Sequence, residues 1–320
     1  MDLVSDVLSG SRLALARLLT HVENDTAEGR RALNSLFAHT GRAHLVGVTG
    51  SPGTGKSSLV ARLARALRGA GGPLDPRVGI IAVDPSSPFS GGALLGDRVR
   101  MRELSGDPGI FIRSMASRGA LGGLAHATSA AAQVLDAAGY GVILIETVGA
   151  GQSEVDIARL AHTVVVVEAP GLGDDIQAIK AGILEIADIL VVNKGDLPGA
   201  EQAARALRNM LELAHTLKPG VLGGEGPAWE TPVLKTSIPL NQGVAEVAEA
   251  ILRHHAHLLE SGELQRRERA RLQNGLELLL QAALVERWRA GVAPETFNEV
   301  LSLLASRRLS PYEALERLLR

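Results

Sequence analysis

The hydrophobic pattern of this 320-residue chain changes near residue 44 and again near residue 244. Before residue 44, apolar positions recur at helical spacing over 2–20, and a second helix is predicted over about 26–39. Between these two points short apolar runs alternate with amphipathic stretches, and the runs are 44–50, 77–84, 140–147, 162–169, 188–196 and 231–237. Apolar runs without polar alternation are typical of strands covered on both faces. We therefore predict an α/β fold with a mostly parallel sheet covered by helices.

After residue 244 the pattern is helical to the end of the chain. It includes an apolar stripe at spacings of three and four residues, formed by Leu272, Leu276, Leu279, Leu280 and Ala283. Such a stripe outside the sheet is expected to pack on its own domain or on a partner subunit. We predict three regions: a helical N-terminal extension over 1–40, an α/β domain over 41–255 and a helical C-terminal arm over 256–320.

The composition narrows the class of protein. Charged residues make up 21% of the chain and the net charge is −2, which gives no support for bulk nucleic-acid binding. The absence of cysteine excludes disulfides, thiolate catalysis and cysteine-ligated metals. The N-terminus does not resemble a signal peptide and no apolar run reaches about 18 residues, so we expect a cytoplasmic protein without a membrane segment.

The segment GVTGSPGTGKSS at 47–58 follows the first predicted strand and precedes a predicted helix. It fits the pattern G-x-x-x-x-G-K-[ST], in which glycines let backbone N–H groups turn toward phosphate oxygens. A Gly-rich turn between a strand and a helix is the plain alternative, but the context favours a phosphate site. Lys56 would then add a cation at the β and γ phosphates, and Ser57 would reach Mg²⁺. The residues expected to contact the nucleotide are Gly50, Ser51, Pro52, Gly53, Thr54, Gly55, Lys56, Ser57 and Ser58.

The tetrapeptide NKGD at 193–196 ends the fifth apolar run. A carboxylate at Asp196 can accept hydrogen bonds from N1–H and the 2-amino group of guanine, a pair of donors that adenine does not offer. Asn193 and Lys194 would brace the base and the phosphate loop, and LKTSIPLNQG at 234–243 would supply Ser237 to the same side. A polar exit from a strand is the plain alternative for the tetrapeptide alone. Its place after the other motifs favours GTP over ATP.

Four further segments belong to the set of motifs, and three of them end or follow predicted strands. ETVGAGQSE at 146–154 begins with Glu146 where many nucleotide triphosphatases have Asp. DPSSPFSGGALLGDRVRM at 84–101 is interpreted as a mobile switch loop beside the nucleotide, with a solvated loop as the plain alternative. RSMASRGALGGLAHA at 113–127 is interpreted as a Gly-interrupted entry to a helix. EAPGLGDDIQAIKAG at 168–182 is expected to begin another helix, whose acids would be N-terminal capping residues on the plain interpretation.

Taken together and in this order, these motifs resemble the MeaB/ArgK/MMAA family of GTPases, and the match runs from about 44 to 240. The resemblance implies a SIMIBI-type P-loop GTPase domain with a C-terminal arm that mediates homodimerisation. It also implies a chaperone of an adenosylcobalamin-dependent acyl-CoA mutase, such as methylmalonyl-CoA mutase, acting on GTP/GDP with Mg²⁺.

The resemblance assigns roles to particular residues. Lys56 and Ser57 would bind phosphate and Mg²⁺, while Asp84, Asp97 and Glu146 would form the acidic set around Mg²⁺ and the γ-phosphate. Gly149 would contact the nucleotide. The residues implied in switching or partner contact are Gln152, Asp174, Asp175, Gln177 and Lys180.

Gln152 lies two residues later than the water-orienting Gln of small Ras-type GTPases. We therefore expect incomplete positioning of the attacking water in the free protein, and slow turnover that a partner accelerates.

Other functions stay open at this point. They are an ATP-dependent small-molecule kinase, a metal-delivery maturation GTPase and a non-catalytic nucleotide-binding scaffold. His254, His255 and His257 could suggest a metal, but no cysteine or carboxylate cluster supports them, so a surface helix face is expected. QRRERAR at 265–271 is likewise interpreted as a solvated helix face, with a partner contact as the alternative. Trp229 is interpreted as a packing residue.

Overall fold

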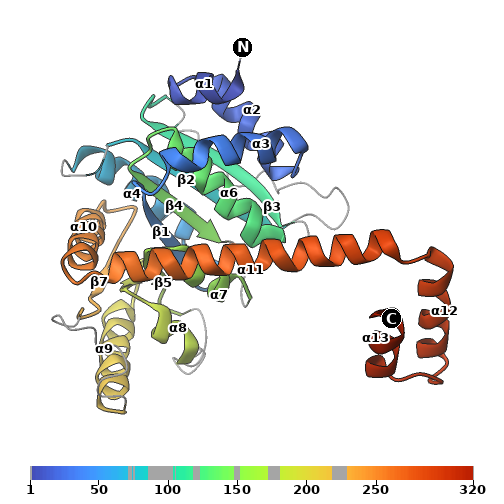
Figure 1. Ribbon diagram of the computed structural model, residues 1–320. Coiled ribbons are helices and arrows are strands. Elements are labelled where there is room, and N and C mark those ends of the chain that lie inside the picture. Colours follow the sequence, from blue (N-terminus) through green and yellow to red (C-terminus); the bar gives the residue numbers. More distant parts are fainter. Residues whose placement is uncertain are drawn as a thin grey trace. The chain divides into compact units, whose positions relative to one another are not determined.

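The computed structural model describes residues 2–70, 74, 76–85, 104, 106–117, 123–147, 152–171, 181–217 and 229–319. A seven-stranded sheet in the order β3-β2-β4-β1-β5-β6-β7 forms its centre (Figure 1). Every strand pair is parallel, so the predicted parallel α/β fold is confirmed. The strands are β1 His44–Thr49, β2 Val78–Pro85, β3 Ile110–Ser117, β4 Val142–Thr147, β5 Thr163–Glu168, β6 Ile189–Val192 and β7 Val233–Lys235.

The strand order reverses at β1. From β1 the chain continues to β2 and β3 on one side, and after β4 it crosses to β5, β6 and β7 on the other side. In open parallel sheets a ligand binds at the carboxyl ends of the strands where the order reverses. The topology therefore predicts a ligand site at the carboxyl end of β1.

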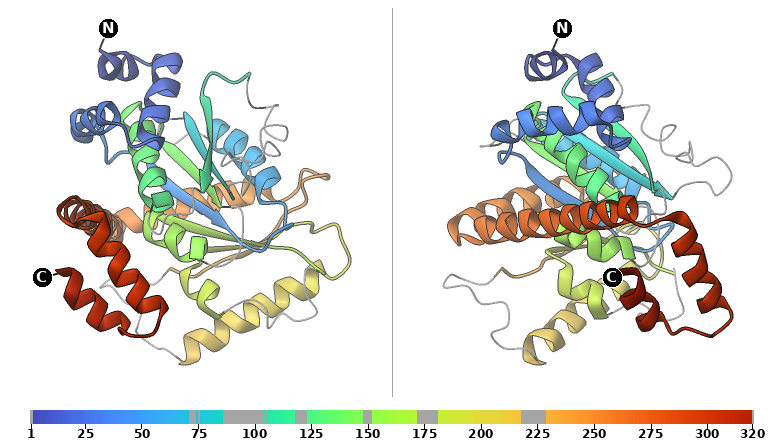
Figure 2. Two further views of the ribbon diagram at one scale, coloured as in Figure 1. Left: turned by 90° about the vertical axis from the view of Figure 1, so that its right-hand side faces the viewer. Right: turned by 45° about the vertical axis from the view of Figure 1, so that its right-hand side comes forward.

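Both faces of the sheet are covered, because apolar residues alternate between two sides along each strand. One face packs against α4 (Lys56–Gly69) and α10 (Val244–Glu260), with Val46, Val48 and Leu144 in this core. The other face packs against the remaining helices of the domain (Figure 2). They are α6 Gly123–Ala137, α7 Gln152–Leu160, α8 Ala181–Ile186 and α9 Ala200–Leu217.

The N-terminal extension forms α1 (Leu3–Leu8), α2 (Arg12–Glu23) and α3 (Ala27–Leu36), and a 3₁₀ turn follows at Phe37–His39. The side chains of Ser11 and Thr26 cap α2 and α3 by accepting backbone N–H groups. Buried leucines of α2 join the core formed with α6. The extension is thus packed on the sheet domain as part of one core.

The strand β3 corrects one prediction. Residues 113–117 belong to β3 and not to a helix entry, and α6 begins only at Gly123. The run was missed because Arg113 interrupts its apolar pattern. In the fold Arg113 forms an ion pair with Glu23 and donates a hydrogen bond to Thr20 at 3.2 Å, so α2 supplies the partners of this charged strand residue.

The chain divides into two compact units, residues 1–271 and 272–320. The helix α11 (Glu263–Gly291) begins in the first unit and ends in the second, which also contains α12 (Pro294–Ala305) and α13 (Pro311–Leu319). Within the second unit Trp288 donates its indole N–H to the Leu318 carbonyl at 2.7 Å. Several large apolar side chains are exposed on this unit, namely Leu276, Leu280, Leu284, Leu301, Tyr312, Leu315 and Leu319. None of the helices in the described ranges is long and apolar enough to cross a membrane.

Candidate nucleotide site

The phosphate loop predicted from the sequence connects β1 to α4 at the carboxyl end of β1. Gly50, Gly53 and Gly55 have φ angles of +135°, +81° and +89°, a backbone region that side chains other than glycine rarely adopt. A Cβ on Gly50 would lie 2.0 Å from the Val167 carbonyl oxygen, and one on Gly55 would lie 2.6 Å from the Asn193 amide nitrogen. Glycine is therefore required at both positions by backbone conformation and by close neighbours.

Lys56 is the first residue of α4 and is buried. Its ammonium donates hydrogen bonds to the carbonyl oxygens of Gly50 at 2.8 Å and Ser51 at 3.0 Å, so it lies across the loop. The amino end of α4 adds the partial positive charge of a helix N-terminus. Together these groups form a cradle suited to an anion.

Glu146 lies in β4 and is fully buried, and its backbone is the register partner of Val48 in β1. Its carboxylate accepts a hydrogen bond from the Ser57 hydroxyl at 2.6 Å. This contact joins the predicted Mg²⁺ residues of two different elements. Asp84 lies in β2, one residue after Val83, which pairs with Thr147, so its backbone reaches the same edge of the sheet.

Other predicted residues fall outside the described part of the chain. The side chains of Asp84 and Gln152 are not described, although the backbone of Gln152 begins α7. The remaining positions outside the described ranges are Asp97, Gly149, Asp174, Asp175, Gln177 and Lys180. Their assignments stay predictions.

The residues predicted to recognise guanine lie next to the phosphate loop. The Asn193 side-chain amide donates to the Thr54 carbonyl at 2.8 Å, and the Thr236 hydroxyl donates to the Asn193 carbonyl oxygen at 2.9 Å. The Ser237 hydroxyl donates to Asp196 at 2.6 Å and, with a backbone hydrogen bond, holds the pKa of that carboxyl below its ordinary value. Asp196 is thus an ionised acceptor at the exit from β6.

The sequence motifs did not indicate a role for Thr236, and they did not predict the backbone conformation of Lys194. Thr236 is buried and orients Asn193 directly, and its position before Ser237 in LKTS was the available signal. Lys194 has a φ of +55°, which is uncommon for a residue with a side chain. The turn that brings Asp196 beside Ser237 therefore begins at Lys194.

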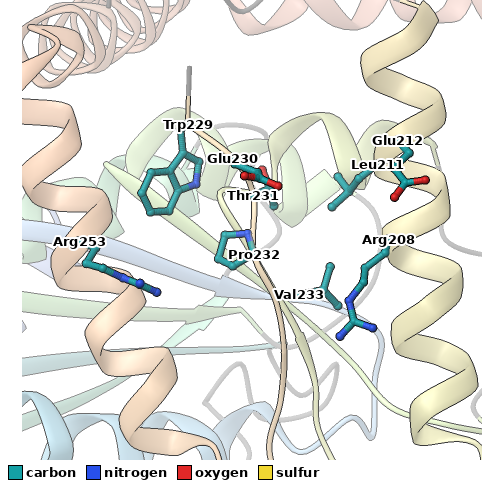
Figure 3. A pocket seen from close by; sticks show the side chains of 9 residues that line it. All are labelled: Arg208, Leu211, Glu212, Trp229, Glu230, Thr231, Pro232, Val233 and Arg253. Atoms are coloured by element: carbon teal, nitrogen blue, oxygen red, sulfur yellow. The ribbon is translucent and has the colours of Figure 1, made fainter. Parts of the chain in front are cut away.

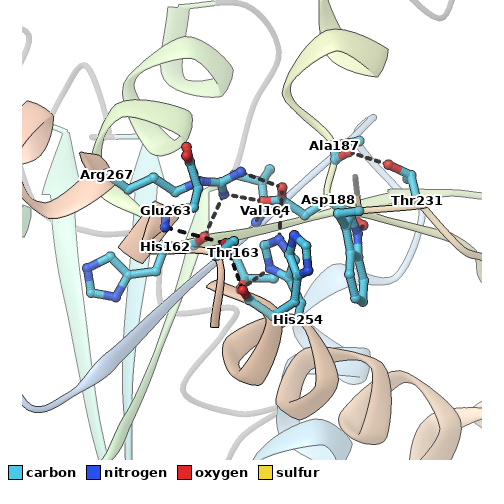
Figure 4. A network of polar contacts seen from close by, with 12 residues as sticks. His162, Thr163, Val164, Ala187, Asp188, Thr231, His254, Glu263 and Arg267 are labelled. Carbon is cyan, nitrogen blue, oxygen red and sulfur yellow. Dashed lines mark hydrogen bonds and ion pairs between the residues drawn. The ribbon is translucent and has the colours of Figure 1, made fainter. Parts of the chain in front are cut away.

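A polar network, defined by His44, His162, Thr163, Asp188, His254, Arg267 and Glu268, lies at the opposite ends of the strands, and all but Arg267 and Glu268 are buried. Figure 4 shows His162, Thr163, Asp188, His254 and Arg267 of this network. The Thr163 hydroxyl lies 2.7 Å from both His44 Nε2 and His254 Nδ1, and His254 Nε2 lies 3.3 Å from Asp188. Because Nε2–H of His254 faces a carboxylate, its Nδ1 is left to accept the Thr163 proton. Thr163 and His254 are fully buried, so this Thr–His–Asp arrangement has no access to a substrate.

The polar network corrects two predictions about helix faces. His254 and His255 are buried and are not surface residues. Arg267 donates to both carboxylate oxygens of Asp188 at 2.8 and 2.9 Å, so 265–271 is not simply a solvated face. Among the described residues, no group of His, Asp or Glu side chains is arranged to hold a metal ion.

A groove of about 510 Å³ lies between α9 and α10, beside the segment that enters β7 (Figure 3). Arg208 and Arg253 line it together with Trp229. Trp229 packs on His254 with ring centroids 4.6 Å apart and donates its N–H to the Asp188 carbonyl at 2.8 Å, as expected for a packing residue. The groove adjoins the amino end of β7 and is separate from the phosphate loop.

Comparisons with known proteins agree on one family. The family described as methylmalonyl-CoA mutase-associated GTPase MeaB matches residues 15–293. A Pyrococcus abyssi protein named as a GTPase is 44% identical, covering 100% of this chain and 95% of the relative. GTPase ArgK of Escherichia coli is 35% identical, covering 97% of this chain and 92% of the relative. A crystal structure titled LAO/AO transport system kinase superposes with a TM-score of 0.71 at 28% identity, covering 99% of this chain and 95% of that one.

Proposed function

The chain belongs to the family of methylmalonyl-CoA mutase-associated GTPases, MeaB, and on that premise we propose that it uses GTP hydrolysis to gate an adenosylcobalamin-dependent acyl-CoA mutase. It is a GTPase with a P-loop fold, as expected from the motifs. The observation that best supports the site is the Asn193 amide. It joins the phosphate loop at Thr54 to the guanine-side residue Thr236.

The proposed reaction is hydrolysis of GTP to GDP and phosphate. Lys56 and the N–H groups of the loop would bind the β and γ phosphates and offset the charge that develops during transfer. Asp196 would accept the two guanine donors, and Ser237 would hold its carboxylate in place. Because an unpaired buried polar group penalises the wrong base, this arrangement favours GTP over ATP.

The residues fit Mg²⁺ by their chemistry. The Ser57 hydroxyl and the Glu146 carboxylate are hard oxygen donors, the type that Mg²⁺ prefers, and they already lie within hydrogen-bond distance of each other. When bound, the ion would neutralise phosphate charge. Asp84 and Asp97 are proposed to complete the acidic set.

The mutase role is proposed from the family description, which names methylmalonyl-CoA mutase as the associated enzyme. Gln152, Asp174, Asp175, Gln177 and Lys180 are proposed as switch or partner residues. The C-terminal arm is proposed to form a homodimer through its exposed apolar side chains. We further propose a cytoplasmic location and a turnover that is slow until the mutase binds.

The test is the GTPase rate of the purified protein alone and with methylmalonyl-CoA, isobutyryl-CoA or ethylmalonyl-CoA mutase. We expect at least a severalfold stimulation and co-elution with one of them, and no turnover by the Lys56→Ala variant. A flat rate without co-elution for all three mutases would remove the chaperone proposal. Transfer of phosphate from ATP to a metabolite would replace it with a kinase.

A further inference from the structure

Glu168, the last residue of β5, lies where β5 meets the phosphate loop and has no role in the site described above. Its carboxylate accepts a hydrogen bond from the Ser51 hydroxyl at 3.2 Å. Its backbone carbonyl accepts the Asn193 N–H at 2.7 Å. One residue therefore contacts both the phosphate loop and the residue that leads to the guanine side.

The loop is held at two points by neighbouring strands. Near its start, Gly50 lies against the Val167 backbone and Ser51 is bonded to Glu168. Near its end, Thr54 is bonded to Asn193. The Asn193 contact belongs to the guanine motif, whereas the Glu168 contact comes from the end of β5.

The Ser51 contact matters because the Ser51 carbonyl is a shared acceptor inside the loop. It accepts the Lys56 ammonium at 3.0 Å and the Thr54 hydroxyl at 2.9 Å. Fixing the Ser51 side chain therefore also restricts the carbonyl that orients Lys56. Since a hydroxyl has one proton, Ser51 gives it to Glu168 and not to a phosphate.

The burial of Glu168 indicates that its contact with Ser51 is not the incidental contact of a frayed strand end. Glu168 is 9% exposed, and a buried carboxylate is costly unless hydrogen bonds compensate it. A carboxylate beside a phosphate site also opposes anion binding by its charge. Its presence there is explained if holding Ser51 contributes more to nucleotide binding than the repulsion removes.

We propose that Glu168 is a positioning residue for nucleotide binding, which acts by holding Ser51 and, through the Ser51 carbonyl, the Lys56 ammonium. The proposal rests on the nucleotide site proposed above. It concerns ground-state binding, so the expected effect is on the dissociation constant and KM, with kcat little changed. A residue that only stabilised the fold would not produce this division between KM and kcat.

The experiment measures the dissociation constant of a fluorescent GDP analogue, and the KM and kcat for GTP. The variants are Glu168→Ala, Ser51→Ala, the double variant and Glu168→Gln. Each alanine variant should raise the dissociation constant about fivefold, the effect of one net hydrogen bond, and the double variant should raise it no further. Glu168→Gln should stay within about twofold of wild type, because its amide oxygen still accepts the Ser51 proton.

The matched control is Glu260→Ala, which removes an exposed carboxylate of α10 away from the loop and should bind as wild type. Wild-type affinity for Glu168→Ala, or additive effects of the two alanine changes, would overturn the proposal. If Glu168→Ala does not fold, Ser51→Ala and its combination with Glu168→Gln test the same coupling. GDP binding requires neither GTP turnover nor a mutase. If turnover and mutase binding are absent but the GDP dissociation constants of the single and double variants follow the expected pattern, only the proposed function is contradicted.

Discussion

Acidification to pH 5 should destabilise the folded protein through the buried histidines His254, His44 and His255. His254 is 1% exposed. Burial lowers its pKa from the ordinary 6.5 to about 4, an effect that Asp188 opposes and that Arg267, His257 and His255 reinforce. Burial also lowers the pKa of His44 and of His255. The unfolded chain therefore binds more protons than the folded chain between about pH 4 and 6.5.

The magnitude follows from proton linkage. Above pH 6.5 both states hold His254 neutral and its contribution is absent; as the pH falls toward 4, the unfolded state gains protons first and the free energy of unfolding decreases. At 1.36 kcal/mol per pKa unit, His254 alone should cost about 2 kcal/mol at pH 5 relative to pH 8. Glu268, whose pKa is about 2 because His162 and Arg271 outweigh its burial, loses its contribution mainly below pH 4.5.

The assay is urea unfolding at pH 8 and pH 5 in the same salt, for wild type, His254→Gln and His257→Gln. The glutamine at 254 does not titrate, so that variant should lose about 2 kcal/mol less than wild type over this pH range. His257→Gln, on the same helix, removes only a lesser cause of the lowered His254 pKa and should retain most of the wild-type pH dependence. Equal pH dependence in wild type and His254→Gln would refute the reasoning, because the buried neutral histidine would then not control acid stability.

Three further predictions concern single residues. Asp196→Ala should weaken GTP binding about 100-fold and leave ATP binding unchanged, which competition with a fluorescent nucleotide measures, because the two guanine donors lose their acceptor. Glu146→Gln should lower kcat at least about 100-fold in Mg²⁺ and change GDP binding without Mg²⁺ less than about threefold. A loss of GDP affinity without Mg²⁺ as large as the loss of kcat with Mg²⁺ would contradict a metal role. Arg267→Met should lower the free energy of unfolding by about 2 to 3 kcal/mol, since Asp188 stays buried without its bidentate partner. Arg266→Met removes a neighbouring, more exposed guanidinium and should change the free energy of unfolding by less than about 0.5 kcal/mol.

The phosphate-loop geometry of the candidate nucleotide site could be predicted from the sequence because its requirements are local. The backbone conformation at positions 50 and 55 requires glycine. The sequence pattern of the loop itself contains Lys56 and Ser57. The family resemblance drawn from these motifs is confirmed. The pairing of Ser57 with Glu146 was foreseen only as a shared role in Mg²⁺ binding, and its 2.6 Å contact depends on the register of β1 and β4.

The remainder depended on partners far away in the chain. Arg113 interrupts the apolar pattern of β3, and its ion-pair partner Glu23 lies far away in the chain, on α2. His254 was placed on a surface because Thr163 and Asp188, which satisfy its ring nitrogens, precede it by many residues. Glu168 ends an apolar strand in the sequence, and only the fold brings Ser51 beside it. Polar groups buried by long-range pairing leave no periodic signal in the sequence.

The same three strands carry both polar sites, one at each end. β1, β5 and β6 have His44, Thr163 and the preceding Asp188 at their amino ends, and lead at their carboxyl ends to Gly50, Glu168 and Asn193. From His44 to Thr49 the backbone advances about 17 Å at 3.3 Å per residue, and apolar side chains fill the interval. Sites that far apart without shared partners should contribute independently to stability.

Arg267→Met should thus leave the GDP dissociation constant within about twofold of wild type, and its effect on unfolding should add to that of Glu168→Ala within about 0.5 kcal/mol. A larger deviation in the double variant, measured by urea unfolding, would mean that the sheet couples the two ends.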